Sequence, residues 1–336
     1  MPVPEISHVH DRFFKTALGR TEVAADFLAH YLPREISREM DLTSLEPRQG
    51  SFVDPDMREH MTDLLFRVRL HSGDEAHVYV LFEHKSAPDR LVALQLLRYL
   101  VCIWDEARRR GEKLTPVIPL VFYHGRERWT VASEFEALYE GPAVLRQYWP
   151  AFRYELVDLS LHSQTEIKGE LLLRVILGVM RNIHSGELDT RLPEIVALLS
   201  DLADRETALE CLAAVLRYVA GASDKVTTAD LERAVAAALP VAGGEVMPTL
   251  AEQWIEEGRQ EGRQEGREEG LEQGLLKGTR RGLLAGMGPA LELKFGSDGV
   301  ALLSELHEIE DVDVLRKVAD AIRTARTVED LRRLCH

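Results

Sequence analysis

Residues 61–86 read MTDLLFRVRLHSGDEAHVYVLFEHKS and contain two apolar segments separated by a short polar tract. In both segments an apolar residue recurs at every second position: Leu64, Phe66, Val68 and Leu70, then Val78, Val80 and Phe82. A period of two is typical of half-buried strands. Residues 71–75 between them have turn composition, with Gly73 available for a positive φ. The stretch therefore predicts a β-hairpin.

Two acids of this hairpin favour a metal site. If the turn centres on Gly73, opposed positions sum to 146, and Asp63 then lies directly across from Glu83. Like charges placed directly across a strand pair destabilise it. A divalent cation between the carboxylates removes this cost, and hard oxygen ligands suit Mg²⁺ or Mn²⁺. Lys85 shares the face of Glu83 and would orient or help deprotonate an attacking water.

Simpler interpretations of these residues stay open. Acids near strand ends are usually solvated, and a Glu-X-Lys triplet arises easily by chance when 29% of residues are charged. A register slip of one residue would turn Asp63 and Glu83 to opposite faces. Pro55-Asp56 offers another Pro-Asp pair, but no apolar strand follows it at once, so Asp63 is the preferred acid.

Asp63 followed twenty residues later by Glu83-X-Lys85 in an apolar strand resembles the catalytic signature of the PD-(D/E)XK nuclease superfamily. The wider context resembles the Rpn family, whose members are called recombination-promoting nucleases or putative transposases, over roughly residues 5–285. The residues that carry this resemblance are His10-Asp11-X-Phe13-Phe14-Lys15, Phe27-Leu28, Tyr31-Leu32-Pro33, Thr62-Asp63-Leu64-Leu65-Phe66 and Phe82-Glu83-His84-Lys85-Ser86. Thr62 stands where the superfamily name has Pro, and Lys85 is kept where many relatives carry Gln.

The resemblance implies an α/β fold with a restriction-endonuclease-like core, a mixed sheet flanked by helices, followed by an all-helical C-terminal region. It implies a metal-dependent DNA endonuclease linked to recombination or mobile DNA, with Mg²⁺, or Mn²⁺ in its place. The implied catalytic residues are Asp63, Glu83, Lys85 and Gln95, the implied metal ligands are Asp63, Glu83 and His84, and the auxiliary candidates are Asp11 and Tyr99.

Three of these candidates have a structural alternative. Gln95 and Tyr99 are four residues apart in a predicted helix over 89–110, and so share a face. This pair resembles a Gln-X-X-X-Tyr motif of the RecB-like branch, although a core Tyr beside a surface Gln fits equally well. Asp11 matches a first-helix acid of the superfamily, and an N-cap role is the alternative.

Charge restricts where DNA would bind. The formal net charge is −15, which argues against a broad basic surface. The balance reverses over residues 85–128, where nine Lys or Arg face five acids. The candidate phosphate contacts there are Arg90, Arg98, Arg126 and Arg128, whereas Arg108–Arg110 fit a solvated helix face at least as well.

Composition also bears on the compartment. Cys102, Cys211 and Cys335 are widely separated and predict neither a disulfide framework nor a zinc site. The first residues carry no basic segment followed by an apolar core, and no apolar run approaches membrane-spanning length. A cytoplasmic protein without a membrane partner is expected.

The remaining periodicities predict the order of elements. A helix over 9–32 is broken near Gly19, a first strand lies within 40–53, a buried strand covers 116–123, an edge strand covers 152–159, and 166–240 is helical. His184 and Cys211 in that helical part are read as isolated structural residues. The predicted domains are a nuclease core (1–165), a helical extension packed on it (166–250), a Gly-repeat helix (251–288) and a small helical region (289–336).

Glycine recurs at every fourth position from Gly258 to Gly286. We call this repeat the glycine ladder and each glycine a rung. A helical Gly costs roughly 0.8–1.0 kcal/mol relative to Ala, and the ladder is flanked by like-charged Glu and Arg columns that weaken an isolated helix. A partner helix in close contact would offset both, so we expect homo-oligomers formed through residues 258–286. A flexible linker is the competing interpretation.

Two other classes of function stay open. One is a catalytically inactive nuclease-fold protein that acts as an oligomeric module binding nucleic acid or a partner, which the retained Lys85 disfavours. The other is a metal-dependent hydrolase of small phosphoesters, which would not need the basic region over 85–128.

Overall fold

The computed structural model describes residues 9–48, 64–83, 88–160, 166–223, 225–238, 246–309 and 311–334. For positions 82, 83, 246–250, 265, 268, 269, 272, 273, 276 and 313 it describes the main chain only. Asp63, His84 and Lys85 lie outside these residues. Contacts divide the chain into two compact units, Ser7–Arg263 and Gln264–His336.

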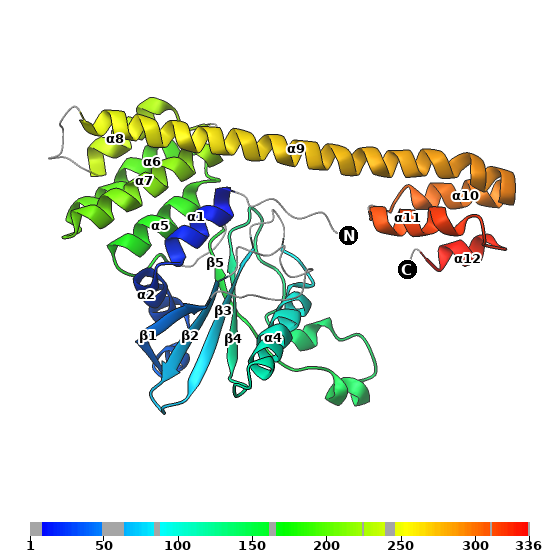
Figure 1. Cartoon of the computed structure of the whole chain (residues 1–336), viewed down its shortest axis with the longest axis horizontal. Helices are drawn as coiled ribbons and strands as arrows, with labels where there is room; N and C mark the ends of the chain where they lie inside the picture. Colours follow the sequence, from blue (N-terminus) through cyan, green and yellow to red (C-terminus); the bar gives the residue numbers. More distant parts are fainter. Residues whose placement is uncertain are drawn as a thin grey trace. The chain divides into compact units, whose positions relative to one another are not determined.

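The first unit is built on one mixed sheet of five strands in the order β1-β2-β3-β4-β5 (Figure 1). The strands are β1 (Met40–Arg48), β2 (Leu64–Leu70), β3 (Glu75–Glu83), β4 (Val117–Tyr123) and β5 (Glu155–Asp158). The pairs β1–β2 and β2–β3 are antiparallel, whereas β3–β4 and β4–β5 are parallel. The predicted hairpin, first strand, buried strand and edge strand are confirmed.

The register of the hairpin corrects the sequence prediction. Leu64 pairs with Val80 and Arg69 with Glu75, so opposed positions sum to 144 rather than 146. The Gly73 N–H donates to Leu70 O and the Leu70 N–H donates to Asp74 O, which closes a three-residue loop with Gly73 last, at φ 92°. A three-residue hairpin loop places its left-handed residue at the end, not in the middle. A shift of two residues keeps every side chain on its face, unlike a shift of one.

Helices cover both faces of the sheet (Figure 1). Phe66, Val78, Val80 and Phe122 belong to the larger core, with residues of α1 (Val9–Leu18), α2 (Thr21–Tyr31), α5 (Leu171–Asn182) and α7 (Arg205–Ala222). On the other face Tyr79, Leu81, Val121 and Tyr123 pack against α4 (Val92–Arg109). Alternate residues of one strand thus serve two cores, as a sheet buried on both faces requires.

The remaining elements of the first unit are mostly short and helical. The predicted break near Gly19 is confirmed, because α1 ends at Leu18 and α2 begins at Thr21. The helical part after β5 contains α5, α6 (Leu188–Ala197), α7 and α8 (Thr228–Ala238), with the 3-10 turn η4 (Leu198–Asp201). The other short elements are α3 (Arg34–Ser37), η2 (Phe135–Leu138) and η3 (Ala143–Tyr148).

The glycine ladder is helical throughout, within the 50-residue helix α9 (Val246–Phe295). The helix prediction is therefore confirmed over the linker alternative. Three short helices follow: α10 (Ser297–Leu306), α11 (Val312–Ala321) and α12 (Val328–Arg332). They enclose a small core with the end of α9, formed by Leu291, Leu302, Leu315, Val318 and Leu331 among others. In the part of the chain that the structure describes, no helix has the length and apolarity needed to cross a membrane.

Candidate functional site

The carboxyl ends of the three parallel strands form one edge of the sheet. Glu83 is the last residue of β3 and pairs in register with Tyr123, the last residue of β4, which pairs in turn with Asp158, the last of β5. The Ser160 N–H donates to Asp158 Oδ1 at 2.9 Å. In open α/β sheets, ligands bind outside the carboxyl ends of the strands. Glu83 thus ends its strand at the edge where a site is expected.

The predicted acid and base partners of Glu83 cannot be placed beside it. Asp63, His84 and Lys85 lie outside the described residues, and the side chain of Glu83 is not described. The convergence of Asp63, Glu83 and Lys85 on one metal stays a prediction. Within the described ranges, no group of three His, Cys, Asp or Glu side chains is arranged to hold a metal ion.

Helix α4 brings Gln95 and Tyr99 to the same side of the sheet as Tyr79. Tyr99 is 3% exposed, and its ring stacks on that of Tyr79 with centroids 4.9 Å apart. Gln95 is half-buried one turn earlier. Because α4 follows β3 in a crossover to the parallel β4, its first turn lies toward the carboxyl end of β3. Tyr99 is therefore a core residue, and Gln95 lies nearer the edge that carries Glu83; the part of either residue in a site stays a prediction.

Asp11 does not cap its helix. It is the third residue of α1, which begins at Val9, and only 5% of it is exposed. A carboxylate within the first turn interacts favourably with the helix dipole. The N-cap alternative is thus wrong, and the role of a first-helix acid stays a prediction.

Three histidines gather next to one another, and the sequence interpretation missed this grouping. His10 of α1, His124 after β4 and His184 after α5 have ring centroids 5.3, 5.3 and 4.9 Å apart. The Tyr218 hydroxyl lies 2.8 Å from His10 Nδ1, and His124 Nε2 donates to Met180 O at 2.7 Å. That donation leaves His124 Nδ1 as the acceptor in the neutral ring. His184 is therefore not isolated, contrary to the sequence interpretation.

The basic residues of 85–128 fall into two groups. Arg108 and Arg109 lie 2.7 Å from carboxylate oxygens of Asp105, and Arg110 lies 2.8 Å from Glu106. These three arginines form ion pairs on the surface of α4, in agreement with their interpretation as a solvated helix face. In contrast, no described acid lies within ion-pair distance of the four candidate contacts, which are all exposed: Arg90, Arg98, Arg126 and Arg128.

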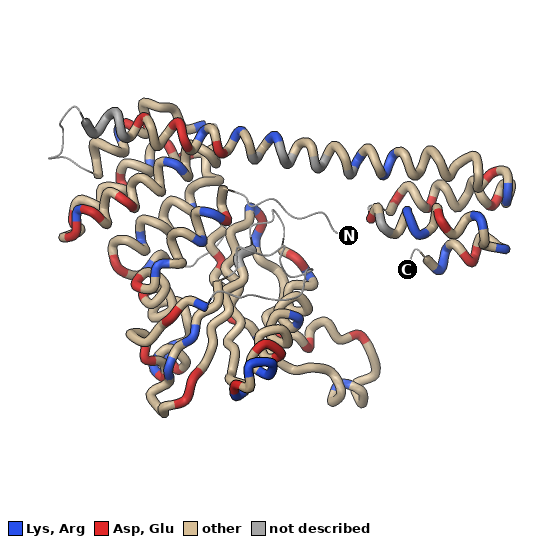
Figure 2. The backbone as a smooth tube through the Cα atoms, in the orientation of Figure 1, with Lys and Arg blue, Asp and Glu red and all other residues tan. Residues whose placement is uncertain are grey.

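The loop after β4 holds Arg126 and Arg128 at the carboxyl edge. The Tyr123 hydroxyl donates to Glu127 O at 3.0 Å, and the buried Trp129 ring meets the Tyr123 ring edge-on at 4.8 Å. These contacts fix both ends of the short loop. Elsewhere Lys and Arg are interspersed with Asp and Glu along the described elements (Figure 2), in agreement with the absence of a broad basic surface among them.

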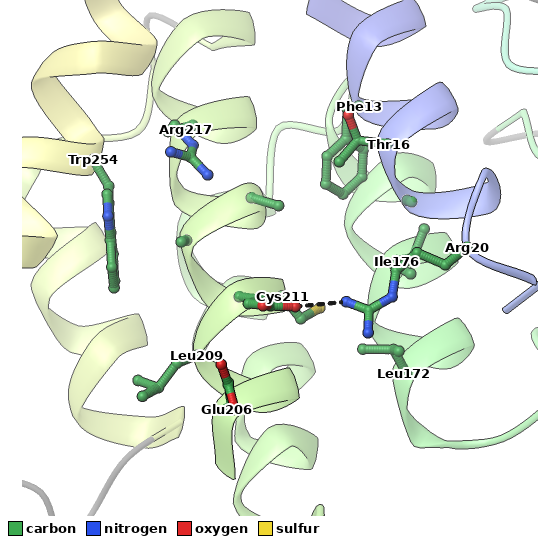
Figure 3. A pocket seen from close by; sticks show the side chains of 14 residues that line it. Phe13, Thr16, Arg20, Leu172, Ile176, Glu206, Leu209, Cys211, Arg217 and Trp254 are labelled. Carbon is green, nitrogen blue, oxygen red and sulfur yellow. Dashed lines mark hydrogen bonds and ion pairs between the residues drawn. The ribbon is translucent and has the colours of Figure 1, made fainter. Parts of the chain in front are cut away.

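A cavity of about 430 Å³ lies between α1, α5, α7 and α9 (Figure 3). Trp254 of α9 borders one side and Phe13 and Thr16 of α1 the other, with Cys211 of α7 between them (Figure 3). Burial raises the pKa of the Cys211 thiol to about 12, so the thiolate is scarce at neutral pH. None of the predicted site residues lines this cavity.

Comparison with known proteins identifies the family. Residues 8–210 match the family described as "Putative transposase, YhgA-like". Recombination-promoting nuclease RpnA of Escherichia coli K12 is 28% identical over 77% of this chain and 87% of its own length. Recombination-promoting nuclease RpnC of the same strain is 30% identical over 74% of this chain and 81% of its own length.

The relatives include a protein without activity. Inactive recombination-promoting nuclease-like protein RpnE, also from Escherichia coli K12, is 28% identical over 75% of this chain and 83% of its own length. No solved structure matches the chain. From the family match and the extent of these similarities, the chain belongs to the YhgA-like family, that of the Rpn recombination-promoting nucleases.

Proposed function

We propose that this protein is a metal-dependent DNA endonuclease with a PD-(D/E)XK active site at the carboxyl edge of its sheet. The observation that carries the proposal is the position of Glu83, which ends β3 beside Tyr123 of the parallel β4. The sequence supplies Asp63 before β2 and Lys85 two residues after Glu83. Membership in a family whose named members include nucleases supports the same conclusion.

The donor atoms available at this edge suit a hard divalent cation. Asp63 and Glu83 would hold Mg²⁺ or Mn²⁺, with His84 as a third ligand, and carboxylate oxygens are the ligands such ions prefer. The bound cation would supply a Lewis acid for phosphodiester hydrolysis. Strand alternation assigns position 83 to the face of Tyr79 and Leu81, which is the face that α4 covers. Gln95, at the start of α4, supports the site from that side.

Lys85 and the nearby arginines would act on the DNA and the attacking water. The Lys85 ammonium would orient the water and stabilise negative charge that develops on the phosphate. Arg126 and Arg128 would hold backbone phosphates, because both are exposed on a loop fixed by Tyr123 and Trp129 at the same edge. Arg90, just before α4, and Arg98, on α4, would extend these contacts.

The second candidate is an inactive nuclease-fold protein that binds nucleic acid or a partner. It is favoured by the inactive relative RpnE. Lys85 weighs against it, because a binding module has no need for the amine that completes the catalytic set. The two candidate functions predict the same fold and differ only in whether the protein cleaves DNA.

Plasmid cleavage separates them. We expect the wild-type protein to nick or linearise supercoiled plasmid with Mg²⁺ or Mn²⁺ and not with a chelator. Asp63→Ala and Lys85→Ala should each lower the rate by about 10²-fold or more, the scale of losing one group that stabilises the transition state. Arg108→Ala is the matched control, because its charge is paired within α4, and it should cleave at the wild-type rate.

The outcomes are distinct. Equal cleavage by the wild type and both site variants would reject the site assignment. DNA binding by a wild-type protein that does not cleave with either metal would establish the inactive binding module instead.

A further inference from the structure

The cavity between α1, α5, α7 and α9 has mostly apolar walls. Its volume of about 430 Å³ falls within the range of roughly 300–1,000 Å³ that is typical of small-molecule sites, which are themselves largely apolar. All the residues that line it belong to the unit Ser7–Arg263. Water gains little beside such walls, because it needs polar partners to hold it. The apolar side chains that form most of the lining are Phe13, Leu172, Ile176, Leu209, Ala214 and Trp254.

Apolar surface of three helices stays open toward the cavity. Leu172 of α5, Ala214 of α7 and Trp254 of α9 line it, and they are only half-buried where they pack against the larger core. In contrast, the residue that follows each of them in the sequence is at most 2% exposed. The three helices are thus firmly packed on the core, and a ligand would bury the surface that they leave uncovered. Burial of apolar surface favours binding in proportion to its area.

The charged groups that line the cavity balance one another, as two arginines and two glutamates. Both arginines are already paired. Arg20 donates to Glu22 at 2.9 Å and to Glu210 of α7 at 3.0 Å. Arg217 of α7 donates to Glu257 of α9 at 3.3 Å. An anionic ligand would have to compete with these carboxylates, and a charge taken out of water without a partner is costly. The lining therefore favours an uncharged ligand.

Two aromatic rings and a sulfur atom border the space. Trp254 of α9 lies on one side and Phe13 of α1 on the other, with Cys211 of α7 between them (Figure 3). Phe13 is held in place, because its ring stacks on that of Tyr218 with centroids 4.2 Å apart. Aromatic side chains favour offset or edge-to-face contacts with a further ring, and a polarizable sulfur atom adds contacts of the same kind. A ligand with a ring therefore gains more from these walls than an aliphatic chain of the same size.

We propose that this cavity binds an uncharged, largely apolar small molecule that carries an aromatic ring. The bound molecule contacts α1, α5 and α7, and it contacts α9 through Trp254. It therefore adds contacts between α9 and the rest of its unit. Because a ligand that binds only the folded chain stabilises it, saturation of the cavity raises the thermal stability of the protein. The site is separate from the proposed nuclease chemistry, since its lining shares no residue with the predicted catalytic set.

A titration with a neutral fluorescent probe tests the site. N-phenyl-1-naphthylamine is uncharged, apolar and aromatic, and its emission rises in apolar surroundings. We expect the full chain to bind this probe saturably, with a dissociation constant in the micromolar range. Anilinonaphthalene sulfonate has nearly the same rings and a negative charge, so it should bind more weakly by about tenfold or more. Absence of saturable binding by the neutral probe, or equal binding of the two probes, would overturn the proposal.

Substitutions that fill the cavity locate the probe. Ala214→Leu and Leu209→Phe add atoms inside the lining, and each should raise the dissociation constant of the neutral probe by about tenfold or more. Ala220→Leu is the matched control, because Ala220 is also half-buried on α7 and lies outside the lining, and it should bind as the wild type does. Thermal unfolding followed by circular dichroism shows that each variant folds. Unchanged binding by both filled variants would reject the cavity as the site.

Protection of Cys211 is a second readout that needs no filled variant. In a chain with Cys102→Ser and Cys335→Ser, the saturating neutral probe should slow labelling of Cys211 by a small neutral thiol reagent by about tenfold or more, because the thiol lines the occupied space. The sulfonate probe at the same concentration should protect it less. Equal labelling rates with and without the bound neutral probe would mean that the probe binds elsewhere, which contradicts the proposal. Neither readout depends on nuclease activity.

Discussion

Two stretches of α9 have the same four-residue repeat and different surroundings. Gly258 and Gly262 lie against the backbone of α7, whereas an added Cβ at the rungs from Gly266 to Gly286 would meet no described atom within 4 Å outside the helix's own backbone. A helical glycine costs roughly 0.8–1.0 kcal/mol, and the docked rungs offset that cost through close packing. The open rungs carry a cost of about 5 kcal/mol in a single chain. The contrast teaches that the same repeat allows a close helix–helix contact at the rungs that meet α7 and carries only the cost of glycine at the later rungs.

The largest expected effect is on the reactivity of Cys211. Gly258→Leu should separate α9 from α7 and expose the cavity that Cys211 shares with Trp254. At pH 8 a thiol with a pKa of about 12 is almost wholly protonated, whereas an exposed thiol is partly ionised. In a chain with Cys102→Ser and Cys335→Ser, the thiol labelling rate should rise by about 10³-fold.

The pH dependence of labelling has a definite sign. In the folded chain the labelling rate should still rise with pH above pH 9, because burial raises the pKa of the Cys211 thiol and only the thiolate reacts. In the Gly258→Leu chain it should level off near pH 9. Gly274→Leu is the matched control on an open rung and should keep the slow rate. Equal labelling rates in Gly258→Leu and Gly274→Leu would mean that the docked and the open stretches of α9 do not differ in their packing.

The next effect is on stability. Gly262→Ala should lower the free energy of unfolding by about 3 kcal/mol, because its Cβ would meet Gly221 O at 2.3 Å and backbone must shift. Urea denaturation followed by tryptophan fluorescence measures this, since Trp254 lies on the docked stretch of α9. A change below about 0.5 kcal/mol would show that the close approach is not needed.

A smaller effect of opposite sign is expected at an open rung. Gly286→Ala should raise the free energy of unfolding of the C-terminal unit by up to about 1 kcal/mol, because Ala is the better helix former and its Cβ meets no described atom outside the helix's own backbone. Thermal unfolding followed by circular dichroism at 222 nm is the readout. If Gly286→Ala lowered the free energy of unfolding instead, this rung would have a contact that the added Cβ disturbs. The difference between docked and open rungs would then not hold at Gly286.

The smallest effect concerns the ion pair between Arg12 and Glu261. Both side chains are substantially exposed, so solvent screens the pair and its coupling energy should stay below about 1 kcal/mol. A double-mutant cycle with Arg12→Ala and Glu261→Gln measures that coupling. A coupling energy well above about 1 kcal/mol would mean that this ion pair, rather than the close approach of the glycine backbone, contributes most of the energy that holds α9 in place.

Local periodicity was enough to predict the strands and the longer helices of the first unit, but not the short elements α3, η2 and η3. The alternation in 64–70 and 76–82 gave two strands of the sheet, and the break near Gly19 separated α1 from α2. The hairpin register was wrong by two residues because composition shows that a glycine is in the turn, but not which loop position it takes. That position depends on the hydrogen bonds that close the loop.

Features that join distant segments could not be read from one stretch. His10, His124 and His184 come from three separate parts of the chain and meet only because α1 and α5 pack on the same side of the sheet. The docking of Gly258 and Gly262 on α7 is equally non-local, since all rungs look alike in sequence. The pairing of Arg108–Arg110 was different, because acids three and four residues earlier were visible in the sequence.

The three-residue loop that ends at Gly73 constrains how relatives of this chain can differ in length. Adding or removing one residue there exchanges inward and outward positions along one of the two strands, and would expose Phe66 while burying Arg67. Length changes between an acid that precedes β2 and the acid that ends β3 are therefore tolerated in even steps. Homologues in which the number of residues in that interval changes by an odd number should carry a compensating bulge in one strand. A sequence alignment that ignores this rule will place the first acid at the wrong position.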